Sequence, residues 1–92
     1  MEKWQIERDK NKAKIQALLP NTNLVKSGIY VFSRVDQDTE IKHAYIGQAK
    51  WLIDRLASHL SGHEHIDLSI KKRGFYSLEN KGGWELNVFY YP

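Results

Sequence analysis

Cysteine is absent from the 92 residues, and proline occurs only twice. A chain without cysteine forms no disulfide framework and no zinc site with thiolate ligands. No apolar run approaches the roughly 18 residues that a membrane span requires, and residues 1–5 lack the apolar core of a secretory signal. These absences favour a cytoplasmic protein that does not enter a membrane, and the length suits one small domain.

Acidic residues are also in the minority, with 11 Asp and Glu against 14 Lys and Arg, which gives a formal net charge of +3. A mild basic excess is common among soluble domains, so its distribution is more informative than its size. Lys71, Lys72 and Arg73 follow one another without an intervening acid, and we name these three residues the basic cluster. We expect the basic cluster, together with Lys50, to contact the phosphates of a nucleic acid.

The N-terminal segment is predicted to be a helix, because residues 2–19 contain neither glycine nor proline and have a helix-forming composition. Charged side chains surround its first half, and a short apolar stripe runs from Ile15 to Leu19. We interpret residues 1–26 as a solvated helix that docks by its last turns, followed by a linker. The alternative is an arm dedicated to contacting DNA. Residues 27–92 would then form the core of the domain.

Two segments, residues 28–34 and 41–47, alternate in polarity and are rich in β-branched and aromatic side chains, which predicts a β-hairpin. A turn centred between residues 37 and 38 would place Tyr30 directly opposite Tyr45, on the same face of the sheet. The same register gives two further pairs, one on the other face and one at the strand ends: Ile29 with Ile46, and Gly28 with Gly47.

From residue 48 to residue 60 the apolar side chains repeat with the period of a helix. Trp51, Arg55 and His59 are spaced by four residues and form a row beside this apolar stripe. We expect the row to border a cleft.

A shorter helix is predicted over residues 66–73 and a third strand over residues 84–91. The predicted fold class is therefore α+β, with a small three-stranded antiparallel sheet flanked by helices and an additional N-terminal helix.

Two tripeptides and two helix residues resemble the signature of the GIY-YIG endonuclease family, which includes the nuclease module of UvrC-type repair enzymes and some homing and restriction endonucleases. The tripeptides are Gly28-Ile29-Tyr30 and Tyr45-Ile46-Gly47, and the helix residues are Arg55 and His59. The order of the predicted elements is similar to the core of that family over about residues 27–91. The resemblance implies a DNA endonuclease.

The chemistry that this resemblance implies is hydrolysis of a DNA phosphodiester with one Mg²⁺ or Mn²⁺ ion. Tyr30 would be the general base, and Tyr45 would orient water or phosphate. Arg55 would hold the scissile phosphate and would make the Tyr30 phenolate accessible by its positive charge. The other members of the two tripeptides would have structural roles: Gly28, Ile29, Ile46 and Gly47.

Histidine assignments also follow from the resemblance. His59 would position the tyrosine or carry protons, and His65 would be a further histidine of the family, with His63 as the alternative assignment. His63, Glu64 and His65 can also be interpreted as metal ligands, but neither an upstream cysteine nor a helical i, i+4 pair accompanies them. We predict that Tyr30, Tyr45, Arg55 and His59 converge on one exposed concave face.

The metal ligand implied by the resemblance is a glutamate on a helix after the third strand, whereas the sequence ends at Pro92, directly after that strand. Neither Glu79 nor Glu85 has the expected position. We therefore expect the ligand to lie beyond Pro92 and the core to be truncated. The alternative is a catalytically inactive nucleic-acid-binding module with the same fold. A protein-interaction domain would be favoured if the N-terminal helix covered Tyr30 and Arg55.

Overall fold

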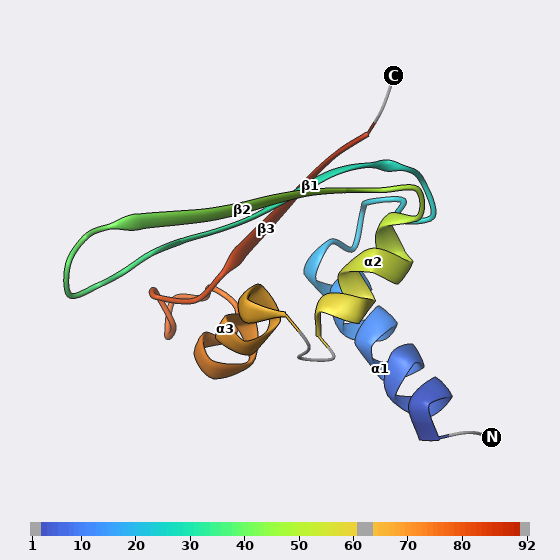
Figure 1. Cartoon of the computed structure of the whole chain (residues 1–92), viewed down its shortest axis with the longest axis horizontal. Coiled ribbons are helices and arrows are strands. Elements are labelled where there is room, and N and C mark those ends of the chain that lie inside the picture. Colours follow the sequence, from blue (N-terminus) through green and yellow to red (C-terminus); the bar gives the residue numbers. More distant parts are fainter. Residues whose placement is uncertain (1–2, 61–63, 91–92) are drawn as a thin grey trace.

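The computed structural model describes residues 3–60 and 64–90, which form three helices and three strands (Figure 1). In chain order the elements are α1 (Lys3–Leu18), β1 (Gly28–Val35), β2 (Lys42–Ala49), α2 (Leu52–His59), α3 (His65–Arg73) and β3 (Glu85–Tyr90). The strands form one antiparallel sheet in the order β2-β1-β3, and the three helices lie on one side of it. The predicted α+β class is confirmed. No helix in the described residues is long and apolar enough to cross a membrane.

The register of the β1–β2 hairpin differs by two residues from the predicted one. Tyr30 lies opposite Gly47, and Tyr45 lies opposite Phe32, so the expected direct pairing of the two tyrosines was wrong. A shift of two residues keeps every side chain on its face, because side chains along a strand alternate with a period of two. Both tyrosines therefore remain on the face that the helices cover.

The turn between these strands explains the shift in register. The backbone N–H of Asp36 donates to the carbonyl of Ile41, so residues 37–40 form the loop. The Asp36 carboxylate accepts hydrogen bonds from the backbone N–H groups of Asp38 and Thr39, a local pattern that aspartate favours in turns. The centre of the turn consequently lies between residues 38 and 39, one residue later than predicted.

Helix α2 begins at Leu52, later than its predicted start at residue 48, because β2 continues through Gln48 and Ala49. These two residues pair with the first two residues of β1. An apolar residue at position 49 fits the period of either element, and pairing in the sheet satisfies its backbone groups. The helix then starts after Trp51, which has an extended conformation.

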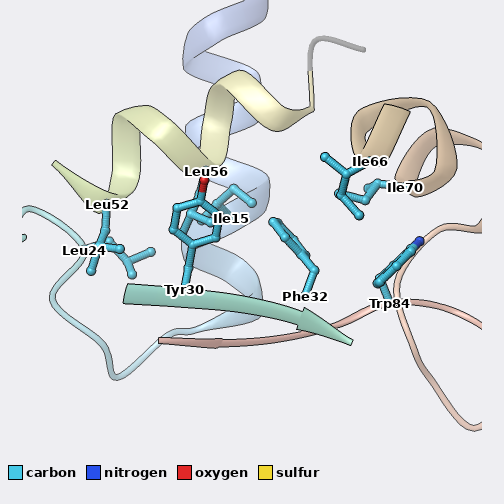
Figure 2. Packing of buried hydrophobic residues seen from close by; sticks show 9 residues of the cluster. All are labelled: Ile15, Leu24, Tyr30, Phe32, Leu52, Leu56, Ile66, Ile70 and Trp84. Carbon is cyan, nitrogen blue, oxygen red and sulfur yellow. The ribbon is translucent and has the colours of Figure 1, made fainter. Parts of the chain in front are cut away.

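The hydrophobic core lies between the helices and the covered face of the sheet (Figure 2). β1 is the central strand and contributes two aromatic rings to the core, and Leu24 joins it from the segment after α1. Burial of this shared apolar surface is the main force that holds the helices on the sheet. The cluster consists of Ile15, Leu24, Tyr30, Phe32, Leu52, Leu56, Ile66, Ile70 and Trp84.

Helix α1 docks against α2 by its second half, as predicted. Ile15 is fully buried, whereas Ile6 near the start of the helix is exposed. Arg8 and Lys12 both reach the carboxylate of Asp54 on α2, with N–O distances of 3.2 and 2.9 Å. The interpretation of α1 as a docked helix is therefore confirmed.

The opposite face of the sheet carries exposed apolar side chains. Ile29 and Ile46 point to this face, as predicted, and Phe89 of β3 lies beside Ile29 in the sheet. Alternation along the strands thus separates the isoleucines of the two tripeptides from their tyrosines.

Candidate functional site

Three buried polar groups form a chain of hydrogen bonds between the sheet and the helices. The phenol oxygen of Tyr30 on β1 lies 2.8 Å from Nε2 of His59, the last residue of α2. Nδ1 of the same imidazole lies 2.5 Å from Oδ1 of Asp67 in the first turn of α3. Because a carboxylate only accepts, Nδ1 donates to Asp67, and in a neutral ring Nε2 then accepts the Tyr30 proton. We name these three residues the buried triad.

A second set of polar side chains lies next to the buried triad at the surface. The Glu64 carboxylate accepts hydrogen bonds from Nη2 of Arg55 at 3.2 Å and from the hydroxyl of Tyr45 at 3.4 Å. The Tyr45 ring packs edge-on against the His59 imidazole, with ring centroids 5.6 Å apart. Arg55 also interacts with the Tyr30 phenol. We name Tyr45, Arg55 and Glu64 the surface group.

Burial dominates the electrostatics of Tyr30. It raises the pKa of the phenol above its ordinary value of about 10, and the neighbouring Arg55 guanidinium offsets only part of this rise. Arg55 lowers the pKa of Tyr30, which is the predicted direction, but the loss of hydration on burial outweighs its attraction. The hydrogen-bonded group that could take the Tyr30 proton is Nε2 of His59.

The four residues that were predicted to converge do meet, but they do not share an exposed face. Tyr30 is 1% exposed and His59 is 0% exposed. Four residues advance the direction of a side chain around a helix by about 40°. Within α2, this rotation takes the row from half-buried Arg55 to His59 in the core, whereas exposed Trp51 precedes the helix.

The motif glycines provide space rather than unusual backbone conformations, since neither has a positive φ. Gly47 lies opposite Tyr30, and a Cβ atom at this position would overlap with the phenol ring. A Cβ atom on Gly28 would collide with the backbone carbonyl of Phe89 on β3. The glycines therefore leave room for the end of the Tyr30 ring over Gly47 and allow β3 to approach β1.

Sequence reasoning did not place either acidic residue of the site correctly. It considered Glu64 only as part of a metal site with neighbouring histidines, and it gave Asp67 no role. The spacing held a usable signal, because the backbone N–H of Glu64 donates to Oδ2 of Asp67 at 3.2 Å. A polar residue followed three positions later by an acidic one is typical of a helix start, and it places both carboxylates at the same end of α3.

The predicted further histidine, His65, is exposed and makes no hydrogen bond to the buried triad among the described residues. It lines a surface hollow of about 440 Å³ together with Tyr45 and Glu64. Asp67, two residues later, has the place beside His59 instead. The alternative histidine, His63, lies outside the described residues, and so does that part of the predicted His63-Glu64-His65 metal site.

Three residues of the site carry ligand atoms that lie within 4.8 Å of one another: His59, Glu64 and Asp67. His59 and Asp67 are buried and share a short hydrogen bond that an ion between them would break. The Glu64 side chain is 46% exposed, and Mg²⁺ is often held by one carboxylate together with water and a substrate phosphate. Glu64 is therefore the residue that fits a Mg²⁺ or Mn²⁺ ion.

The basic cluster does not lie at this site. The basic cluster forms the last turn of α3, whereas Glu64 caps the first turn, so the nine-residue helix separates them by about 12 Å. Its three side chains are exposed, as is Lys50 between β2 and α2. Arg73 is instead close enough to the hairpin turn to contribute to the lowered pKa of Asp36, which comes first from the backbone N–H of Asp38.

Comparisons with protein-family models, with curated proteins and with solved structures found no match for this chain.

Proposed function

We propose that this protein is a metal-dependent DNA endonuclease of the GIY-YIG type, which hydrolyses a phosphodiester bond. The observation that supports this proposal is that the surface group lies directly beside the buried triad. Phosphodiester hydrolysis needs positive charge at the phosphate and a path for the proton of the attacking water. The surface group would supply the positive charge, and the buried triad would supply the proton path.

The surface group contains a position suited to a phosphate. The Glu64 carboxylate lies there now, where it accepts from both Arg55 and Tyr45. A phosphate oxygen is also an anionic acceptor, and the planar fork of an arginine matches phosphate geometry. The scissile phosphate would displace Glu64 and take over these two donors.

The buried triad supplies the proton path. As water attacks phosphorus, it gives a proton to the Tyr30 oxygen while Tyr30 gives its own proton to Nε2 of His59. The imidazolium that results is stabilised by the Asp67 carboxylate at Nδ1, as in other pairs of histidine and carboxylate. This exchange avoids a free phenolate, which burial of Tyr30 disfavours. The leaving oxygen takes its proton from solvent.

Glu64, once displaced from Arg55, would hold the Mg²⁺ or Mn²⁺ ion. When bound, such an ion neutralises charge on the phosphate and the leaving oxygen, a contribution of several kcal/mol.

The proposal is tested by nicking of supercoiled plasmid with Mg²⁺ or Mn²⁺. We expect metal-dependent nicking that falls at least about a hundredfold in Tyr30→Phe, which interrupts the proton path, and that is lost in Glu64→Gln. Tyr76→Phe is the matched control, because it removes a hydroxyl from an exposed tyrosine outside the site. Equal nicking by all variants would contradict the proposal. Nicking by the parent chain that stays at the background level would contradict the role of Glu64.

The second candidate is a nucleic-acid-binding module without catalysis. The burial of Tyr30, which keeps its phenol away from solvent, favours it. Binding of a fluorescent duplex without nicking, with equal affinity for Tyr30→Phe and the parent chain, would support this candidate over the nuclease.

Both candidates predict that DNA binding weakens as salt rises. Replacement of the basic cluster by glutamine should reduce the slope of log affinity against log salt by about 0.9 for each phosphate that the protein no longer neutralises. Lys50→Gln should act in the same direction, and Lys10→Gln on α1 is the control. An unchanged slope would show that these residues do not bind phosphates.

A further inference from the structure

One face of the sheet is not covered by any helix of the described residues, since all three helices lie on the other side (Figure 1). We name it the uncovered face. Large apolar side chains stand at one end of it: Ile46 is 69% exposed, Phe89 59% and Ile29 36%. Ile29 pairs with Phe89 across the sheet, and Val31, the next residue of β1 on this face, pairs with Ile46. We name Ile29, Val31, Ile46 and Phe89 the apolar ridge.

The hairpin end of the uncovered face is hollow instead. Ser33 of β1 lies opposite Ala44 of β2, and both side chains are small. Gly83, just before β3, has no side chain. A hollow of about 280 Å³ lies over these residues, and Tyr76 and Lys81 line it from the segment that precedes β3. The two ends of the face therefore have opposite shapes.

We propose that the uncovered face binds the uncovered face of a second copy of this chain, so that the apolar ridge of each copy enters the hollow of the other. Sheets that pack face to face keep their strands roughly aligned, about 10 Å apart. A two-fold axis between the sheets, crossing the strands at the level of Phe32, makes the two β1 strands antiparallel and brings each ridge over the other hollow.

The register of the sheet gives the residues that would meet in this arrangement. Val31 lies over Ser33 of the second copy, and Ile46 lies over Ala44. Phe89 lies one step beyond the start of β3 in the second copy, over Gly83 and the hollow. A large side chain thus meets a small one in each pair, which is the condition for close packing between two sheets.

The charged residues of the uncovered face are compatible with this arrangement. Lys42 lies over the amide of Gln48 of the second copy, and Glu85 lies over the amide of Asn87. An amide offers an oxygen to a lysine and N–H groups to a carboxylate. Among the described strand residues, no two like charges are therefore placed opposite each other.

The other two-fold arrangement, with its axis along the strands, fits the face less well. It would place Phe89 over Gln48 and Ile46 over Asn87, and it would place the two hollows over each other. It gains one ion pair at each edge, but an exposed ion pair contributes less than the burial of a large apolar side chain.

The size of the face indicates a weak dimer. It is three strands wide and up to eight residues long. At about 4.8 Å between strands and about 3.3 Å per residue, its flat area is roughly 370 Å² per copy. A total of roughly 700–1,000 Å² is typical of weak, reversible complexes. The face shares no residue with the buried triad or the surface group, so the proposal does not depend on nuclease activity.

The test is sedimentation velocity of the parent chain, without DNA or metal, from about 5 to about 500 µM. We expect a monomer at the lowest concentration and mostly dimer at the highest, with a Kd of about 10–100 µM. A chain that stays monomeric throughout would overturn the proposal and would leave the uncovered face to an occupant other than a second copy.

Two substitutions change the opposite ends of the face. Phe89→Lys places a cation on the ridge, next to Lys81 of the second copy, and Ala44→Arg fills the hollow. Both positions are exposed, so the core stays intact. Each variant should raise the dimer Kd at least about tenfold. Ile6→Lys, at an exposed apolar position of α1 on the helical side, is the matched control and should leave it unchanged. An unchanged Kd in the first two variants, or an equal rise in all three, would overturn the proposal.

The orientation is tested by cross-linking, because the chain contains no cysteine of its own. Ile29→Cys and Val35→Cys each place one thiol at an exposed position of β1 on the uncovered face. We expect a short bismaleimide to join the two variants in an equal mixture. It should not join either variant to itself, because identical positions lie about 20 Å apart along the antiparallel strands. Cross-linking of each variant to itself would overturn the antiparallel arrangement.

Discussion

Tyr30 and Arg34 lie on the same face of β1, about 13 Å apart, and both are buried. The two side chains differ in how completely their polar atoms are hydrogen-bonded. The Tyr30 hydroxyl begins a continuous chain through His59 to Asp67, whereas Arg34 keeps a buried donor without an acceptor among the described residues. One end of the strand thus contains a closed polar network, and the other contains an open one.

The difference shows that burial alone does not indicate what a polar side chain does. In a closed network each group stabilises its neighbours, so removal of one member leaves the others unsatisfied in a region of low dielectric constant. In an open network the charge is already poorly compensated, so its removal relieves a cost as well as removing favourable interactions. The stability of variants with substitutions at each end of β1 can therefore test this comparison.

The largest effect is expected for Asp67→Ala. This change leaves Nδ1 of His59 without its acceptor and removes the acceptor for the backbone N–H of Glu64. We expect the free energy of unfolding to fall by about 3 kcal/mol, as measured by urea denaturation. The control, Glu79→Ala at an exposed turn position, should change it by less than about 0.5 kcal/mol. A loss below about 1 kcal/mol for Asp67→Ala would show that the network is not closed.

Tyr30→Phe should have the next largest effect. The ring and its packing remain, but Nε2 of His59 loses its partner, which should reduce the stability by about 1.5 kcal/mol. Because burial raises the pKa of Tyr30, the unfolded chain ionises first as pH rises past about 10. The parent protein should therefore lose stability above this pH more steeply than Tyr30→Phe. Parallel pH curves for the two proteins would contradict this.

Arg34→Met should change the stability by less than about 1 kcal/mol in either direction. The substitution removes the hydrogen bond to the Gly82 carbonyl and the interaction with the Trp84 ring, but it also removes a buried charge. Thermal unfolding measures the balance. A loss above about 2 kcal/mol would show that the guanidinium is well compensated and that the two ends of β1 are alike.

The smallest effect is expected for Asp54→Asn, at an exposed ion pair that lies outside both networks. The hydrogen bond from Lys12 lowers the pKa of the Asp54 carboxyl, with a further contribution from Arg8. This interaction should contribute about 0.5 kcal/mol, since solvent screens it. A lowered pKa in the folded state stabilises above the unfolded pKa of about 4 and ceases to do so as pH falls through the folded pKa. The difference between Asp54→Asn and the parent should therefore vanish on acidification, and a persistent difference would contradict it.

The elements of the fold could be predicted because their signals are local. Alternation in β1 and the helical period around Leu56 identify a strand and a helix without knowledge of their neighbours. The register of the hairpin could not be predicted in the same way, because the side chain of Asp36 determines where the turn is centred. The end of β2 at Ala49 likewise depended on pairing with β1.

The candidate site was predicted in part. The resemblance drew attention to Tyr30, Tyr45, Arg55 and His59, and the structure brings them together. Asp67 was given no role, and Glu64 was considered only within a metal site, because carboxylates at a helix start usually serve as caps. His65 was chosen by its position in the sequence, and no local pattern distinguished it from Asp67 as the neighbour of His59.

The sequence by itself determined the fold class, the helical face of α2 and the face of each strand residue, because these depend on the periods of helix and strand. Tertiary structure decided which polar groups are buried and what they touch. His59 is buried because α2 packs against the sheet, and Asp67 meets it because α3 starts beside α2. Nη2 of Arg34 has no acceptor among the described residues because Asp36 is held by its own turn. These outcomes depend on contacts between residues that are far apart in the chain. The local periodicity of a sequence does not show which of these residues meet.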